Sequence, residues 1–204
     1  TKKNILKTLV LLILIIDGVM QPANAASNEK LTIGISQEFE NLNPLISQMQ
    51  ATNYINLMVY RPLVLLDENW KWQCHLCKTI PSLENGLAEI IEENGKKKIV
   101  AHWEIKDNAK WGDGTPITAH DFVLGWEIAS SDTVSTGEKE IYTQVEKITI
   151  DPNNAKKFTF KYEKAKYDFA YLPQFYLMPK HLEQKVWDRV KNETGGYEKQ
   201  TTYN

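Results

Sequence analysis

Two stretches of alternating apolar and polar residues, each turned back on itself, constrain the fold of this 204-residue chain most strongly. The first covers residues 87–105 and turns at Asn94-Gly95, a dipeptide typical of two-residue hairpin turns. The second covers residues 145–162 and turns at residues 151–154, which read Asp-Pro-Asn-Asn. Alternation with a period of two places one face of a strand in the core. The sequence therefore predicts two antiparallel β-hairpins.

The segment before the first hairpin contains two further strand signals and one helix signal. Residues 31–35 alternate and are rich in β-branched side chains, which predicts a strand. From Thr52 onward, apolar residues recur at helical spacing until Pro62, which ends the predicted helix because proline lacks a backbone N–H. Residues 63–66 then predict a short strand.

Two more helices are predicted from their starting residues. Thr118 and Asp121 have the spacing of a capping box, and the helix that they begin runs to about residue 130. Pro179 stands in the favoured first position of a helix that runs to about residue 190. Residues 192–204 are polar, and we expect them to form no closing element. This mixture of hairpins and helices indicates an α/β (mixed α+β) fold.

The N-terminus has the pattern of a secretory signal. Lysines in the first seven residues precede an apolar run over residues 9–16, and Ala23-Asn24-Ala25 provides a small-x-small cleavage site. The alternative is a membrane anchor, which requires about 20 apolar residues, and Asp17 interrupts this run too early. We therefore predict that residues 1–25 are a signal peptide cleaved between Ala25 and Ala26, and that no stable membrane insertion remains after cleavage.

The charge balance argues against a nucleic-acid partner. The whole chain has a formal net charge of −2, and residues 26–204 carry 21 basic and 25 acidic side chains. A mildly acidic body without a basic stripe lacks the electrostatic signature of nucleic-acid binding.

Motifs for catalysis or nucleotide binding are not found. No histidine lies in a hydrolase or zinc-protease motif, and no glycine-rich phosphate loop occurs. We therefore expect surface or helix-capping roles for the four histidines, and no catalytic residue, cofactor or metal site. Asp113 and Asp121 could act as paired carboxylates, although acidic residues are also favoured in loops and at helix starts. The histidines are His75, His102, His120 and His181.

Cys74 and Cys77 have a two-residue spacing that allows several interpretations. In an exported protein the pair is a candidate for a local disulfide. Half of a metal site and a redox-active dithiol remain open as alternatives, although the chain has no other cysteine to complete a four-ligand zinc site.

Four segments together resemble one known family. Residues 103–123 contain Ala-Lys-Trp-Gly-Asp-Gly-Thr-Pro followed by Thr-Ala-His-Asp-Phe. Residues 42–44 read Leu-Asn-Pro, residues 59–63 read Val-Tyr-Arg-Pro-Leu, and residues 177–181 read Leu-Met-Pro-Lys-His. Taken in their order along the chain, these segments closely resemble the family 5 extracellular solute-binding proteins. Those are the periplasmic oligopeptide-, dipeptide- and nickel-binding components of ABC importers.

The resemblance implies a periplasmic binding protein type 2-like fold that is incomplete in this chain. Family members are usually more than twice as long, so we expect a fragment. Residues 26–50 correspond to the first segment of lobe I, residues 51–163 to lobe II, and residues 164–204 to the return into lobe I. Lobe III, which closes over the ligand, is then absent.

The resemblance also implies a function. Such a protein is periplasmic, delivers short peptides to an inner-membrane ABC permease, closes around its ligand without catalysis, and is a monomer when full length. The segment after residues 31–35 matches the edge that pairs with a peptide in the family, which makes Gln37, Glu38, Phe39 and Glu40 the expected ligand contacts. Nickel, haem or murein fragments remain open as cargo. An exported interaction domain, and a thiol oxidoreductase that uses Cys74 and Cys77, remain as alternative functions.

Overall fold

The structure is a computed structural model, which describes residues 31–204. The predicted signal peptide therefore lies outside the described residues. The chain divides into two units, residues 1–35 and 36–204, and each is treated by itself. Residues 31–35 form no regular secondary structure, so the strand predicted there is wrong. A strand is held by the backbone hydrogen bonds of a neighbour, and no strand within residues 31–204 pairs with this segment.

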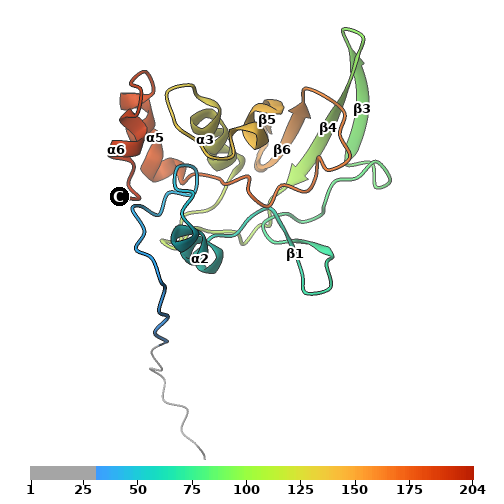
Figure 1. Cartoon of the computed structure of the whole chain (residues 1–204). Helices are drawn as coiled ribbons and strands as arrows, with labels where there is room; N and C mark the ends of the chain where they lie inside the picture. Colours follow the sequence, from blue (N-terminus) through green and yellow to red (C-terminus); the bar gives the residue numbers. More distant parts are fainter. Residues whose placement is uncertain (1–30) are drawn as a thin grey trace, which may run out of the picture. The chain divides into compact units, whose positions relative to one another are not determined.

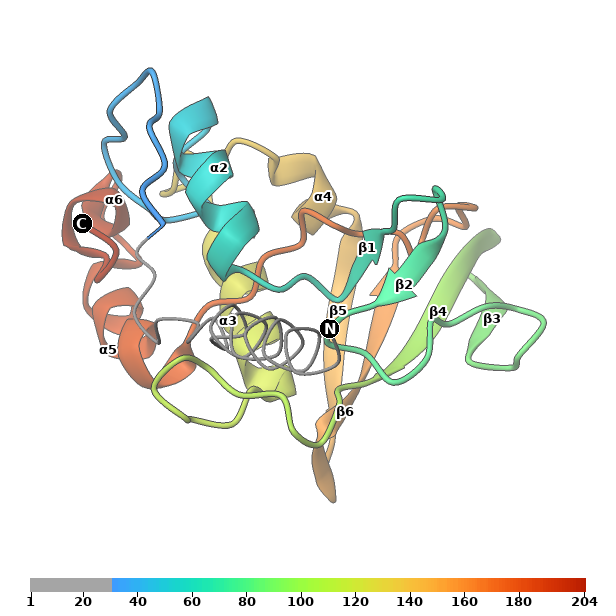
Figure 2. The ribbon, with the colours of Figure 1, turned by 90° about the horizontal axis from the view of Figure 1, so that it is seen from below.

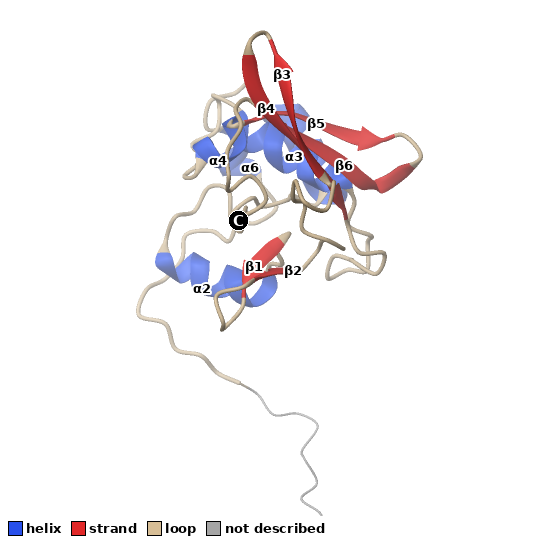
Figure 3. Ribbon diagram, turned by 90° about the vertical axis from the view of Figure 1, so that its right-hand side faces the viewer, coloured by secondary structure: helices blue, strands red, loops and turns tan. Residues whose placement is uncertain are grey.

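A four-stranded antiparallel sheet is the largest element of residues 36–204 (Figure 3). Its strands are β3 (Ala88–Glu93), β4 (Lys96–Glu104), β5 (Val145–Asp151) and β6 (Asn154–Tyr162), in the order β3-β4-β6-β5. Both predicted hairpins are confirmed. The turn between β3 and β4 contains Asn94 and Gly95 at φ of 53° and 70°, the left-handed conformations that two-residue hairpin turns require.

One face of this sheet is covered by helix α3 (Ala119–Ser130), as Figure 1 shows. The alternating residues of β4 and β6 place Trp103, Phe158 and Phe160 in the core, where each is at most 2% exposed. Phe122 of α3 stacks on Phe158 with ring centroids 5.0 Å apart. Burial of these large aromatic side chains from both layers stabilises this part of the chain.

The segment 169–178 runs between α3 and helix α2 (Gln50–Val59). It contains no helix or strand. Gly125 allows it to lie close to α3, because a Cβ at this position would be 2.5 Å from the carbonyl oxygen of Tyr176. On the other side, the Tyr60 hydroxyl, just after α2, donates a hydrogen bond to the Leu177 carbonyl at 2.7 Å.

Helix α2 and a small sheet form the side of this unit shown towards the viewer in Figure 2. Strand β1 (Val64–Leu66) pairs antiparallel with β2 (Trp72–Cys74). The predicted helix that ends before Pro62 and the strand after it are therefore confirmed. The apolar spacing of α2 does not mark its buried face, however. Its buried residues are Ala51, Thr52 and Asn56, whereas Tyr54, Leu57, Met58 and Val59 are exposed.

The C-terminal residues form a closing element, contrary to the prediction for residues 192–204. Helix α5 (Lys180–Val190) begins at Pro179, which occupies the N-cap position rather than the first helical position. Helix α6 (Gly196–Gln200) then buries Tyr197, whose ring meets Trp187 of α5 edge to face at 5.9 Å. Tyr197 is the buried aromatic residue that the polar composition of residues 192–204 did not reveal.

The short helix α4 (Lys139–Thr143) lies between α3 and β5 in sequence.

Candidate binding cleft

A large cavity lies beside α2 and is referred to here as the α2 cleft. It has a volume of about 730 Å³, within the range of about 300–1,000 Å³ that ligand sites occupy. Its walls come from α2, from residues 60–65, from His75 and from residues 173–176. A side pocket of about 180 Å³ adjoins it and shares Asn53, Gln174 and Tyr176 with it. Residues far apart in the sequence therefore line two adjoining cavities.

Aromatic residues form one wall of the cleft. Tyr60 packs edge to face on Tyr176, with ring centroids 5.5 Å apart. The Tyr60 hydroxyl also lies 3.0 Å from that of Tyr203. Burial raises the pKa of Tyr60 well above its usual value, so its hydroxyl stays protonated and holds the Leu177 carbonyl at neutral pH. These contacts join α2, the 169–178 segment and the C-terminal residues beneath the cleft.

The polar side chains that line the α2 cleft among residues 31–204 are mostly groups that can donate or accept a hydrogen bond, and Arg61 is the one that only donates. Asn56 is 3% exposed, and its Nδ2 has no hydrogen-bond partner within the described part of the chain. Burial, followed by the charges of Arg61 and Lys106, lowers the pKa of His75, which keeps its imidazole neutral at pH 7. No aspartate or glutamate lines the cleft among residues 31–204. The cleft therefore offers a ligand both donors and acceptors, together with one positive charge at Arg61.

A disulfide fixes the loop that carries His75. The structure joins Cys74 and Cys77, whose Cα atoms are 5.1 Å apart. The backbone N–H of His75 donates to the Leu63 carbonyl at 2.9 Å, and the Lys106 ammonium donates to the Cys74 carbonyl at 2.9 Å. These bonds hold His75 at the wall of the cleft. Within residues 31–204, no group of three or more potential ligand side chains is arranged to hold a metal ion.

The expected ligand contacts lie elsewhere. Residues 36–40 have no helix or strand, and Gln37, Glu38, Phe39 and Glu40 are all exposed. None of them lines the α2 cleft or the side pocket, so their contact role stays a prediction. The sequence interpretation missed Asn53, Asn56 and Tyr176 as cleft residues, and it noted Arg61 only within a segment of family resemblance.

The two acidic candidates have structural partners. Asp121 is 3% exposed, and its carboxylate accepts from the Thr118 N–H at 2.7 Å and from the Lys180 N–H at 2.8 Å. It therefore caps both α3 and α5. Asp113 accepts from the Thr115 N–H at 2.8 Å and bonds to His181. Each carboxylate has separate partners, which supports the loop and helix-start interpretation over paired acid–base chemistry.

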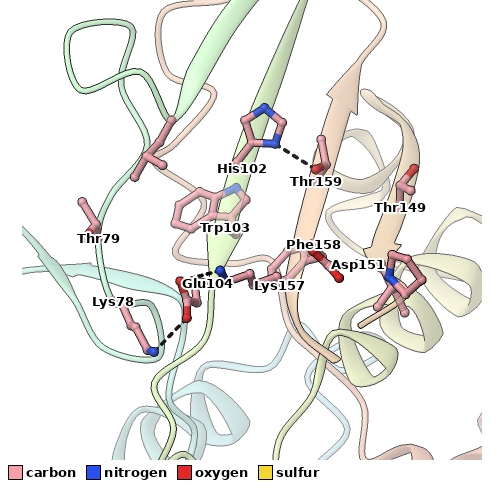
Figure 4. Close-up of a pocket in the computed structure, with 13 residues that line it drawn as sticks. Lys78, Thr79, His102, Trp103, Glu104, Thr149, Asp151, Lys157, Phe158 and Thr159 are labelled. Atoms are coloured by element: carbon pink, nitrogen blue, oxygen red, sulfur yellow. Dashed lines mark hydrogen bonds and ion pairs between the residues drawn. The ribbon is translucent and has the colours of Figure 1, made fainter. Parts of the chain in front are cut away.

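A second cavity, of about 370 Å³, lies mainly on the face of the four-stranded sheet that α3 does not cover (Figure 4). There the His102 ring, on β4, lies 3.0 Å from the Thr159 hydroxyl, on β6. Glu104 forms ion pairs with Lys78 at 2.8 Å and with Lys157 at 3.8 Å. Because these charged groups already have partners of opposite sign, this cavity is a weaker candidate than the α2 cleft.

Of the helices between residues 31 and 204, none is both long and apolar enough to cross a membrane.

Comparisons with known proteins give a consistent result. The model for bacterial extracellular solute-binding proteins, family 5 (middle), matches residues 82–203. The periplasmic oligopeptide-binding protein OppA of Salmonella typhimurium is 47% identical over 51 residues, which cover 24% of this chain and 9% of OppA. The periplasmic murein peptide-binding protein MppA of Escherichia coli is 65% identical over 23 residues, 11% of this chain and 4% of MppA.

A solved structure extends the similarity to most of the fold. The oligopeptide-binding protein of Thermus thermophilus, solved in complex with a pentapeptide, matches with a TM-score of 0.67 and 28% identity. The match covers 78% of this chain and 27% of the Thermus chain. The fold is therefore the mixed α/β fold of part of an oligopeptide-binding protein, and the chain spans about a quarter of the length of that relative.

Proposed function

Since this chain belongs to the family 5 bacterial extracellular solute-binding proteins, we propose that it is part of a periplasmic receptor that binds short peptides and delivers them to an ABC importer. The observation that carries the proposal is the α2 cleft, which lies within a fold shared with a protein solved in complex with a pentapeptide. The names of the relatives, which describe binding proteins, support a binder rather than an enzyme.

The chemistry of the cleft suits an extended peptide. Each peptide unit offers one N–H donor and one C=O acceptor, and the side-chain amides of Gln50, Asn53 and Gln174 can both donate and accept. Leu57 and Tyr176 provide apolar surface for side chains. Polar contacts to the backbone combined with apolar walls allow peptides of different sequence to bind, because the backbone is common to all of them.

The remaining parts of the proposal rest on the N-terminal sequence pattern and on the family resemblance. The signal sequence exports the chain to the periplasm with cleavage after Ala25, and the partner of the ligand-loaded form is an inner-membrane ABC permease. The lobe boundaries at residues 50 and 163, and the contact role of residues 37–40, belong to this proposal. Binding proceeds by a hinge motion that closes the lobes around the peptide.

Native mass spectrometry of the full-length product of the gene, purified from the exported fraction, tests the proposal. We expect a protein that carries a mixed set of short-peptide adducts. Removal of these peptides should lower the melting temperature, and a pool of tri- to pentapeptides should restore it, because a ligand at 100 times its Kd stabilises the folded state by about 2.7 kcal/mol. A protein without adducts whose melting temperature does not respond to the pool would contradict the function.

A further inference from the structure

Among residues 31–204, Arg61 is the only residue lining the α2 cleft that carries a full charge at neutral pH, given that His75 is neutral there. It is exposed, and within the same range its guanidinium forms no ion pair. A guanidinium offers five N–H donors in a planar arrangement that matches a carboxylate in two parallel hydrogen bonds. An arginine in a cleft without acidic neighbours is therefore suited to bind a carboxylate of the ligand.

Asn56 points to a ligand independently of Arg61. This residue lines the same cleft, is 3% exposed, and leaves its Nδ2 without a partner in the described part of the chain. Buried polar groups in native proteins are nearly always hydrogen-bonded, and an unpaired donor costs stability. Its Nδ2 is itself shielded from solvent, so an acceptor oxygen of a ligand in the cleft would satisfy this amide after a small rotation of the Asn56 side chain.

The surrounding charges favour an anionic group over a cationic one. Lys106 adds a second positive charge near His75, and the charges of Arg61 and Lys106 both act on this imidazole. Glu138 lines the adjoining side pocket, but no carboxylate from residues 31–204 lines the α2 cleft itself, so a lysine or arginine side chain of a peptide would find like charges at its Arg61 end.

We propose that the Arg61 end of the α2 cleft binds a carboxylate of the peptide, with the Arg61 guanidinium and the Asn56 amide as donors. This inference rests on the proposed function and adds the ligand chemistry of one end of the cleft. The carboxylate belongs either to the C-terminus of the peptide or to an acidic side chain, and the experiment distinguishes these two sources.

Arg61 also has a structural alternative role. It follows the C-terminus of α2, and a positive charge near the last carbonyl groups of a helix stabilises that helix. In that case its removal would lower the melting temperature and leave the preference among ligands unchanged. The chain supplies a matched control, because its only other arginine, Arg189, is exposed on α5 and does not line the cleft.

The test measures the affinity of three peptides by isothermal titration calorimetry, with the full-length product of the gene and its R61Q, R61K and R189Q variants. The peptides are tetra-alanine with a free C-terminus, tetra-alanine amide, and Ala-Ala-Glu-Ala amide. We expect the wild type and R189Q to bind at least one carboxylate-bearing peptide about tenfold or more tightly than tetra-alanine amide, since charge-assisted hydrogen bonds are the strong ones. R61Q should lose this preference, whereas R61K should retain part of it.

The preferred peptide identifies the source of the carboxylate. Preference for free tetra-alanine indicates the C-terminus, and preference for the glutamate peptide indicates a side chain. Equal affinity of the wild type for all three peptides would overturn the inference and leave the proposed function intact. An R61Q variant that keeps the preference, whether or not its melting temperature falls, would also overturn it. Failure of the wild type to bind these peptides or the peptide pool would contradict the proposed function itself.

Discussion

Asp113 and His181 are 68 residues apart in sequence, and the Oδ2 of Asp113 lies 2.7 Å from the Nε2 of His181. This contact joins the Asp-Gly-Thr-Pro loop to the first turn of α5. Asp121 makes a second connection between the same regions through the Lys180 N–H. Two of the segments that carry the family resemblance are therefore held together by these contacts, which gives both a structural role.

The Asp113 contact predicts a stability that depends on pH. Hydrogen bonds from Thr115, followed by the bond to His181, lower the pKa of Asp113 below its usual value of 3.8. The ionised carboxylate is thus favoured in the folded state, and its contribution is complete above the unfolded-state pKa and is lost as the pH falls through the lower folded-state pKa. D113N should lower the melting temperature by a few degrees at pH 7, and the difference from wild type should shrink below about pH 4. A difference that grows on acidification would contradict this account.

Replacement of Asp121 should lower the stability of the folded state more than replacement of Asp113, because Asp121 caps two helices at once. D121A removes the acceptor for the N–H groups of both Thr118 and Lys180. Loss of one N-terminal cap costs about 0.5–2 kcal/mol, so we expect the free energy of unfolding in urea to fall by about 2–4 kcal/mol. D188A, at an exposed position of α5, serves as the control and should change it by less than about 0.5 kcal/mol. Equal effects of the two variants would rule out the double cap.

We predict that the buried carboxylate of Glu183 holds the C-terminal residues 196–204 in place. It is fully buried, and it accepts from the Tyr197 hydroxyl at 2.6 Å and from the Thr202 N–H at 2.8 Å. Asn43, from the Leu-Asn-Pro turn, donates to the same tyrosine hydroxyl at 3.2 Å. E183A leaves the buried Tyr197 hydroxyl without its carboxylate acceptor and releases the Thr202 N–H, so the free energy of unfolding should fall by about 2–4 kcal/mol.

The matched control for Glu183 is E193Q, at an exposed position after α5. Limited proteolysis provides a second measurement, because the loosened residues 196–204 should be cleaved faster in E183A than in E193Q. If residues 196–204 of E183A remain as protected as in the wild type, Glu183 does not hold this segment.

The elements that the sequence predicted correctly have strong local signals. Asn94-Gly95 determines its hairpin through left-handed backbone conformations, and Thr118 with Asp121 determines a helix start through their own hydrogen bonds. The strand at residues 31–35 was predicted from a short alternating pattern and β-branched composition, although strand formation depends on a partner that neither reveals. The C-terminal helix α6 was missed because its burial depends on Tyr197 and on the distant Glu183.

The cleft could not be predicted from the sequence because its walls are far apart in the chain. Arg61 and Tyr176 line the same cavity although 115 positions separate them. The residues of α2 also show that apolar spacing does not always mark the core, because Leu57 and Met58 belong to the cleft and are exposed. Only the tertiary path of residues 169–178, along α3 and beside Tyr60, brings these groups together.

We predict that the close packing of α3 on residues 169–178 at Gly125 also affects peptide binding in the α2 cleft. A Cβ in G125A would be 2.5 Å from the Tyr176 carbonyl oxygen, which is backbone and cannot move without displacing the segment. Overpacking of this kind costs about 1–3 kcal/mol, and the shift of Tyr176 should weaken binding of the peptide pool. G112A is the control, because a Cβ there would meet nothing within 4 Å. Unchanged peptide affinity in G125A, measured by calorimetry, would show that Tyr176 does not shape the site.

The disulfide predicts a modest loss of stability and no loss of peptide binding. The loop closed by Cys74 and Cys77 spans only three peptide steps, so in the chain-entropy model its removal costs about 2 kcal/mol. The C74S/C77S double variant should lose that amount in urea unfolding, and the reduced wild type should match it. Both should still be stabilised by the peptide pool, because the backbone bonds of His75 and Lys106 continue to hold the loop. An assay of insulin disulfide reduction addresses the alternative function. If the wild type catalysed this reduction and the double variant did not, the thiol pair would be the site of a redox activity, and the purely structural role would be wrong.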